Sequence, residues 1–121
     1  DYVTFLGRKT KEEIAQILSS EDIYVISSEI ETFSITGIEA LAAGLPIVST
    51  KCKGPEEYID DNTGVLCEIG NPNDMARAII ECYNKKYDIN KLKKTAHNFD
   101  KKIVIAKTID IYKKIIEKTT N

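Results

Sequence analysis

Two glutamates, Glu31 and Glu39, bracket a polar segment that follows an apolar run of the chain. The residues between them include Phe33, Ser34 and Ile35, which we expect at the first turn of a helix. Backbone N–H groups at that turn have no acceptor within the helix, and the positive end of the helix dipole lies beside them. An anion such as a diphosphate, or a ring of sugar hydroxyls, would be stabilised there. The segment therefore predicts a binding site for a phosphate- or sugar-bearing molecule.

Glu39 is expected one helical turn beyond Ile35, on the same helix face. A carboxylate there would repel phosphates, but it suits a vicinal diol, as acidic residues do for ribose in dinucleotide sites. The spacing of Glu31 and Glu39 is a weak signal by itself, because glutamate is common and such pairs arise by chance. The alternative interpretation of the isolated pair is two carboxylates that face solvent.

The elements that must position these residues alternate along the chain. Apolar, β-prone runs predict strands at residues 2–6, 22–27, 46–50 and 65–68. Helical periodicity and end signals predict helices at about 11–20, 35–43, 54–59, 72–83, 88–98 and 100–118. Thr10 and Glu13 form a capping box, Asn71 precedes a proline at a helix start, and Gly44 is suited to end a helix. Alternating strands and helices predict an α/β fold with a Rossmann-like parallel sheet and flanking helices.

A complete nucleotide-binding sheet of this type usually has six strands. Only four are predicted here, and the first begins at residue 2. We therefore expect an N-terminally truncated domain over residues 1–98, followed by a C-terminal helix in residues 99–121.

Composition excludes several other classes of function. The formal net charge of −2 gives no electrostatic reason to expect binding to nucleic acid or to an anionic membrane. Cys52, Cys67, Cys82 and the single His97 match no metal-ligand spacing, and we interpret the cysteines as apolar packing residues in a reducing compartment. We expect neither a metal nor a cofactor, and a cytoplasmic location, since no signal peptide or membrane-spanning run is present.

Several motifs in order resemble the signature of retaining glycosyltransferase family 4, whose members have the GT-B fold. Residues 27–35 (SSEIETFSI) and 39–50 (EALAAGLPIVST) carry the main resemblance. Further matches are FLG at 5–7, GPEEYI at 54–59, TGVL at 63–66 and NDMARAI at 73–79. The resemblance covers about residues 2–83, and it implies the nucleotide-sugar-binding half of a two-domain enzyme.

The resemblance also implies roles for individual residues. Glu39 matches the glutamate that binds the ribose hydroxyls of the nucleotide, and Glu31 matches the one near the donor sugar. Glu31 is expected to position the substrate in the catalytic centre and not to act as a nucleophile. The backbone amides of Phe33, Ser34 and Ile35 match those that meet the sugar and diphosphate.

Lys9 matches a position whose main chain often reads the edge of the base; the alternative is an exposed loop lysine. Three positions depart from the family pattern. Small residues usually stand where Thr32 and Ser34 are found, most often glycine in the second place. A Gly-Gly pair is common where this chain has Lys53 and Gly54.

For the intact enzyme, the resemblance implies transfer of a hexosyl group from a nucleoside diphosphate sugar to an acceptor hydroxyl, with retention and without a metal. We expect the base to be uridine. The family holds the donor pyrophosphate with an upstream arginine and lysine, but Arg8 and Arg77, the only arginines here, do not lie in that context. We therefore expect this chain alone to transfer nothing.

The partner expected from the resemblance is the absent N-terminal acceptor domain, to which the helix in residues 99–121 would cross. Peripheral membrane contact is expected only through that domain. Two other interpretations remain: a related GT-B enzyme such as a nucleotide-sugar epimerase or a phosphorylase, and a non-catalytic Rossmann-like module that binds a nucleotide or a partner protein.

Overall fold

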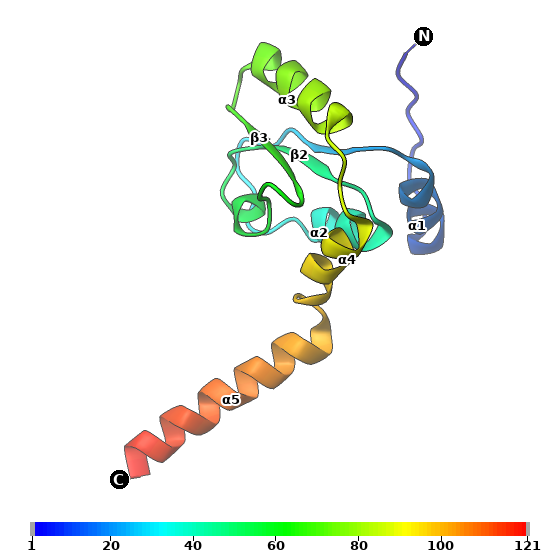
Figure 1. Ribbon diagram of the computed structural model, residues 1–121. Helices are drawn as coiled ribbons and strands as arrows, with labels where there is room; N and C mark the ends of the chain where they lie inside the picture. Colours follow the sequence, from blue (N-terminus) through cyan, green and yellow to red (C-terminus); the bar gives the residue numbers. More distant parts are fainter. Residues whose placement is uncertain (1, 121) are drawn as a thin grey trace.

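The computed structural model describes residues 2–120, and its centre is a three-stranded parallel sheet (Figure 1). The strands are β1 (Tyr24–Ile26), β2 (Ile47–Thr50) and β3 (Gly64–Cys67), in the order β1-β2-β3. Every residue of β2 is buried, as expected for the central strand of a sheet that is covered on both faces. The α/β class and the parallel sheet predicted from the sequence are confirmed.

The helices begin and end close to the predicted positions. They are α1 (Lys11–Ser20), α2 (Ile35–Ala43), the 3-10 helix η1 (Gly54–Glu57), α3 (Pro72–Asn84), α4 (Ile89–His97) and α5 (Lys101–Thr120). Local signals set these bounds. The Thr10 hydroxyl accepts from the Glu13 amide at 3.2 Å, the Glu13 carboxylate accepts from the Thr10 amide at 2.7 Å, and Gly44 ends α2 with a φ of 88°.

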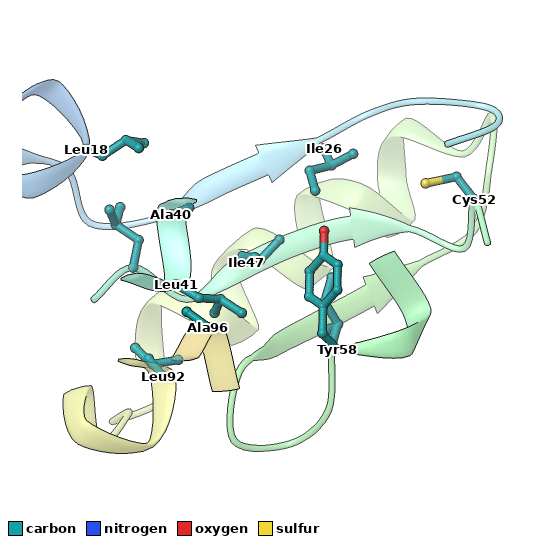
Figure 2. Packing of buried hydrophobic residues seen from close by; sticks show 11 residues of the cluster. Leu18, Ile26, Ala40, Leu41, Ile47, Cys52, Tyr58, Leu92 and Ala96 are labelled. Carbon is teal, nitrogen blue, oxygen red and sulfur yellow. The ribbon is translucent and has the colours of Figure 1, made fainter. Parts of the chain in front are cut away.

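Successive side chains of β2 point to opposite faces of the sheet, and the core therefore has two layers. Ile47 faces α2 and α4, where it packs with Leu41 and Leu92, as Figure 2 shows. Val48 faces the other side, where it packs with Ala78 of α3. The three cysteines are buried free thiols within these layers, as the sequence predicted: Cys52, Cys67 and Cys82.

The prediction of a strand at residues 2–6 is wrong. This segment has no strand structure, and Tyr2 and Phe5 are almost fully exposed. In Figure 1 it runs from α1 away from the sheet. A strand forms only where its backbone can pair with a neighbouring strand. The observed order β1-β2-β3 corresponds to strands 4, 5 and 6 of the Rossmann order 3-2-1-4-5-6. The segment before β1 would then be strand 3, which pairs with strand 2 and not with β1. β-propensity therefore does not produce a strand here.

The last helix, α5, extends away from the body of the molecule (Figure 1). None of its described residues is buried, and Ile109, Tyr112 and Ile116 are 47%, 63% and 64% exposed. Within residues 2–120, no helix has both the length and the apolar character needed to span a membrane.

Candidate functional site

The loop between β1 and α2 ends in a strained residue that starts the helix. Ser34 adopts the left-handed conformation, with φ 63° and ψ 83°, and α2 begins at the next residue, Ile35. The position of this helix N-terminus was predicted correctly. The backbone N–H groups of Phe33, Ser34, Ile35 and Thr36 have no hydrogen-bond acceptor among residues 2–120. Four donors are thus unsatisfied at the positive end of α2.

A second loop holds the first one in place through the backbone. The Glu31 amide donates to the Cys52 carbonyl, and the Gly54 amide donates to the Glu31 carbonyl, both at 2.9 Å. A Cβ atom on Gly54 would come closer than 3.0 Å to the backbone of Thr32 and Phe33. The approach of the two loops therefore requires glycine at position 54, which matches the second glycine of the usual Gly-Gly pair.

At the first position of that pair, this chain has Lys53 in place of the usual glycine, and its backbone is strained. Lys53 has a φ of 81° and a ψ of −84°, a positive-φ conformation that is strained for lysine and open to glycine. Ser34 and Lys53 are the two non-glycine residues with positive φ among residues 2–120. Both stand at positions where the resemblance noted above implies glycine in many members. Two of the three departures noted in the sequence therefore coincide with backbone strain at this loop pair.

Glu31 is half-buried at the carboxyl end of the sheet. Its carboxylate accepts a hydrogen bond from the Ser28 hydroxyl at 3.3 Å, and the Ser28 carbonyl accepts one from the Thr50 hydroxyl at 2.5 Å. Since Thr50 ends β2, these contacts tie the Glu31 loop to the strand end, the edge at which open α/β sheets bind ligands.

An aromatic cluster packs against the loop between β1 and α2. The rings of Phe33, Tyr58 and Phe99 lie 5.1 to 6.1 Å apart, centroid to centroid. The Tyr58 hydroxyl donates to the Ser34 carbonyl at 3.1 Å, and burial raises the pKa of Tyr58 to about 12, so the hydroxyl keeps its proton at neutral pH. The sequence offered no signal for this contact beyond an aromatic residue in the segment 54–59.

Glu39 and Lys9 line one pocket, of about 310 Å³, between the segment before α1, α1 itself and α2. The wall between them is mostly apolar and includes Leu6, Gly7, Ile14, Ile17, Leu18 and Tyr24, with Thr36 at the start of α2. Thr36 was not predicted as a site residue, although it follows Ile35 directly. The Lys9 ammonium lies 3.8 Å from the Glu13 carboxylate, and Glu39 forms no salt bridge among residues 2–120.

Glu39 also borders other pockets, one of which has a volume of about 360 Å³ and a wall that includes Ile35. Glu39 and Ile35 thus share one helix face, as predicted, and the Ile35 side chain is 70% exposed. Glu31 lines none of these pockets. The structure therefore brings Lys9, Glu39 and the start of α2 together, and it places Glu31 at the strand-end side of the same loop.

Comparison with known proteins decides the family. Residues 1–103 match the family described as glycosyl transferases group 1. The chain belongs to this family. Among its relatives, an uncharacterized glycosyltransferase of Methanocaldococcus jannaschii is 29% identical over 121 residues, which is 99% of this chain and 34% of that protein. A D-inositol 3-phosphate glycosyltransferase of Mycobacteroides abscessus is 38% identical over 87 residues, 71% of this chain and 20% of that protein.

The group 1 glycosyltransferase chain also has a structural neighbour. The sucrose-phosphate synthase of Thermosynechococcus elongatus matches with a TM-score of 0.78 at 23% identity, over 95% of this chain and 30% of that one. This likeness shows the fold, which is that of a GT-B glycosyltransferase domain. The chain spans about a third or less of the length of these three proteins.

Several charged residues elsewhere in this glycosyltransferase chain form ion pairs. The Arg77 guanidinium contacts Asp74 at 2.7 Å and Glu81 at 2.5 Å, and the Lys51 ammonium pairs with Glu68. These pairs lie on α3 and at the ends of β2 and β3, away from the pocket of Lys9 and Glu39. Among residues 2–120, no three His, Cys, Asp or Glu side chains gather closely enough to hold a metal ion.

Proposed function

We propose that this chain is the donor-binding part of a retaining family 4 glycosyltransferase. The full enzyme would move a hexosyl group from a nucleoside diphosphate sugar, with uridine as the base, to an acceptor hydroxyl. The observation that carries the proposal is the pocket in which Lys9 and Glu39 lie together, beside the unsatisfied N–H groups that begin α2.

In the proposed binding mode, each part of the donor meets a group of suitable chemistry. The apolar wall of the 310 Å³ pocket covers the base, and the main chain at Lys9 reads its edge. The exposed carboxylate of Glu39 accepts hydrogen bonds from the ribose hydroxyls. The amides of Phe33, Ser34 and Ile35 donate to the diphosphate and sugar.

Glu31 completes the proposed donor site on the side of the transferred sugar. Its backbone is anchored to the Cys52 and Gly54 segment, and its carboxylate is held by Ser28. An anchored carboxylate at a strand end is suited to orient a sugar hydroxyl, which is a positioning role. We propose no covalent step through Glu31.

The experiment that tests the proposal separates binding from transfer. The 121-residue chain is titrated with UDP, GDP and ADP by calorimetry, and a radiolabelled UDP-hexose is then offered with acceptors to this chain and to the longer protein. We expect the chain to bind UDP but transfer nothing, and the longer protein to form a product with the donor's anomeric configuration by NMR. Absence of nucleotide binding, or an inverted product, would overturn the proposal.

We further propose that residues 1–98 form the donor domain and that the helix in residues 99–121 crosses to the acceptor domain of the longer protein. The support is the apolar side of α5, which nothing in residues 2–120 covers. Its exposed residues include Ile105, Ile109, Tyr112 and Ile116.

The crossing predicts a length-dependent effect of Ile109→Asp. In the longer protein, Ile109→Asp should lower the free energy of unfolding by at least about 1.5–3 kcal/mol, the contribution of one buried apolar side chain. In the 121-residue chain, where Ile109 is 47% exposed, it should change little. Denaturant unfolding of both lengths measures the difference, with the charge change Lys107→Asp on another side of α5 as the control. Equal effects in the two lengths would contradict the crossing.

A further inference from the structure

The hydrogen bond between Tyr58 and Ser34 has a consequence for the start of α2. The Tyr58 hydroxyl holds the Ser34 carbonyl at 3.1 Å, and the peptide bond that follows Ser34 is trans. In a planar trans peptide, the N–H points opposite to the C=O. The Ile35 N–H therefore points away from the aromatic cluster, and it has no acceptor among residues 2–120.

The same carbonyl belongs to the strained residue of the loop. The left-handed conformation of Ser34 costs roughly 1 kcal/mol relative to glycine, and its side chain makes no capping hydrogen bond to the helix. Its hydroxyl lies within hydrogen-bond distance of the neighbouring Thr36 hydroxyl, at 3.2 Å. The carbonyl accepts from the Gly37 amide at 3.1 Å and from the Tyr58 hydroxyl. Among residues 2–120, the bond from Tyr58 is the one hydrogen bond that ties this peptide to a distant segment.

Two features keep the Tyr58 hydroxyl in place. A Cβ atom on Gly37 would come closer than 3.0 Å to that oxygen, so the missing side chain of Gly37 makes room for it. The Tyr58 ring is 4% exposed and packs edge-on against Phe33 and Phe99, at 5.5 and 6.1 Å between centroids. The ring cannot swing away without breaking these contacts.

We propose that Tyr58 is a positioning residue of the donor site: it fixes the Ser34–Ile35 peptide so that the Ile35 amide faces the diphosphate of the bound nucleotide. This inference rests on the proposed function. It predicts that Tyr58 acts on the phosphate-bearing part of the ligand and not on the nucleoside.

The test replaces only the hydroxyl. Tyr58→Phe keeps the ring, and Tyr83→Phe, at a tyrosine that is 68% exposed on α3, is the matched control. UDP and uridine are titrated into the ¹⁵N-labelled 121-residue chain, and binding is monitored by NMR through the backbone amide chemical shifts. Tyr58→Phe should weaken UDP binding by about 3- to 10-fold, the effect of one lost hydrogen bond. Uridine binding should stay unchanged, and Tyr83→Phe should alter neither ligand.

A double-mutant cycle with Ser34→Gly provides a second measure. Glycine adopts the left-handed conformation without strain, so the peptide needs less restraint. In the Ser34→Gly background, Tyr58→Phe should change UDP affinity by less than about 2-fold, well below its effect in the original chain. An undiminished effect in this background would contradict the restraint.

The possible outcomes separate the two proposals. If the unmodified chain binds neither UDP nor uridine, the proposed function fails, and this inference fails with it. If UDP binds and Tyr58→Phe leaves its affinity unchanged, only the role of Tyr58 is overturned. Equal losses for UDP and uridine would assign Tyr58 a general structural role and would also overturn the inference.

Discussion

Replacement of Glu39 with alanine is expected to weaken UDP binding by about 5- to 150-fold. This range corresponds to roughly 1–3 kcal/mol, the scale of charge-assisted hydrogen bonds from two ribose hydroxyls. Glu39 is exposed, lies in the pocket with Lys9, and has no salt bridge among residues 2–120. Its carboxylate therefore has no structural partner to lose, and the fold should remain intact. Calorimetry on the 121-residue chain measures the effect.

Two controls make the Glu39 prediction specific to ribose. Glu29→Ala removes an exposed carboxylate from the loop before α2 and should leave UDP affinity unchanged. A UDP analogue without the 2′- and 3′-hydroxyls should bind the Glu39→Ala variant and the original chain equally. Unchanged UDP binding by Glu39→Ala, in a protein that binds UDP, would refute the ribose assignment.

A methyl group at position 54 is expected to have the largest effect on the fold around the site. In Gly54→Ala, the new Cβ would collide with the backbone of Thr32 and Phe33, and neither loop has a flexible side chain at that point to move aside. We expect the free energy of unfolding to fall on the order of 3 kcal/mol, the upper end for an overpacked methyl group. The loop of Phe33 would also shift, so UDP binding should be lost beyond detection.

Gly70→Ala is the matched control for that prediction. Gly70 has a φ of 68°, but a Cβ there would meet nothing within 4 Å. The substitution should cost roughly 1 kcal/mol from backbone strain alone and should leave UDP binding intact. Denaturant unfolding and calorimetry measure both variants. If Gly54→Ala is no more destabilising than Gly70→Ala and still binds UDP, the close approach of the two loops does not support the site.

Much of the secondary structure followed from signals that act over a few residues. The capping box of Thr10 and Glu13 starts α1, and Gly44 ends α2 in a left-handed turn. The strands within 22–68 were predicted because each is an apolar run bounded by turn residues. β1 proved three residues shorter and β2 one residue shorter, and β3 is shifted by one residue. The start of α2, with its unsatisfied N–H groups, was also predictable, because a polar loop before a helical stripe leaves those donors unpaired wherever the helix packs.

Only the tertiary structure decided what those elements bring together. Three features of the site depend on contacts between segments far apart in the chain. They are the pocket that Lys9 shares with Glu39, the hydrogen bond from Tyr58 to Ser34, and the requirement for glycine at position 54. Residues 2–6 show the reverse case: their composition favours a strand, but no neighbouring strand lies beside them, and they form none.

The same division applies to the segment from Glu31 to Glu39. The sequence by itself determined its chemistry, a helix N-terminus between two carboxylates, because capping and helical periodicity are local properties. Its geometry was decided by packing, which placed Glu39 in the pocket of Lys9 and anchored Glu31 to a strand end. Backbone contacts between distant loops cost chain entropy and form only when the whole core assembles, so no local pattern could reveal them.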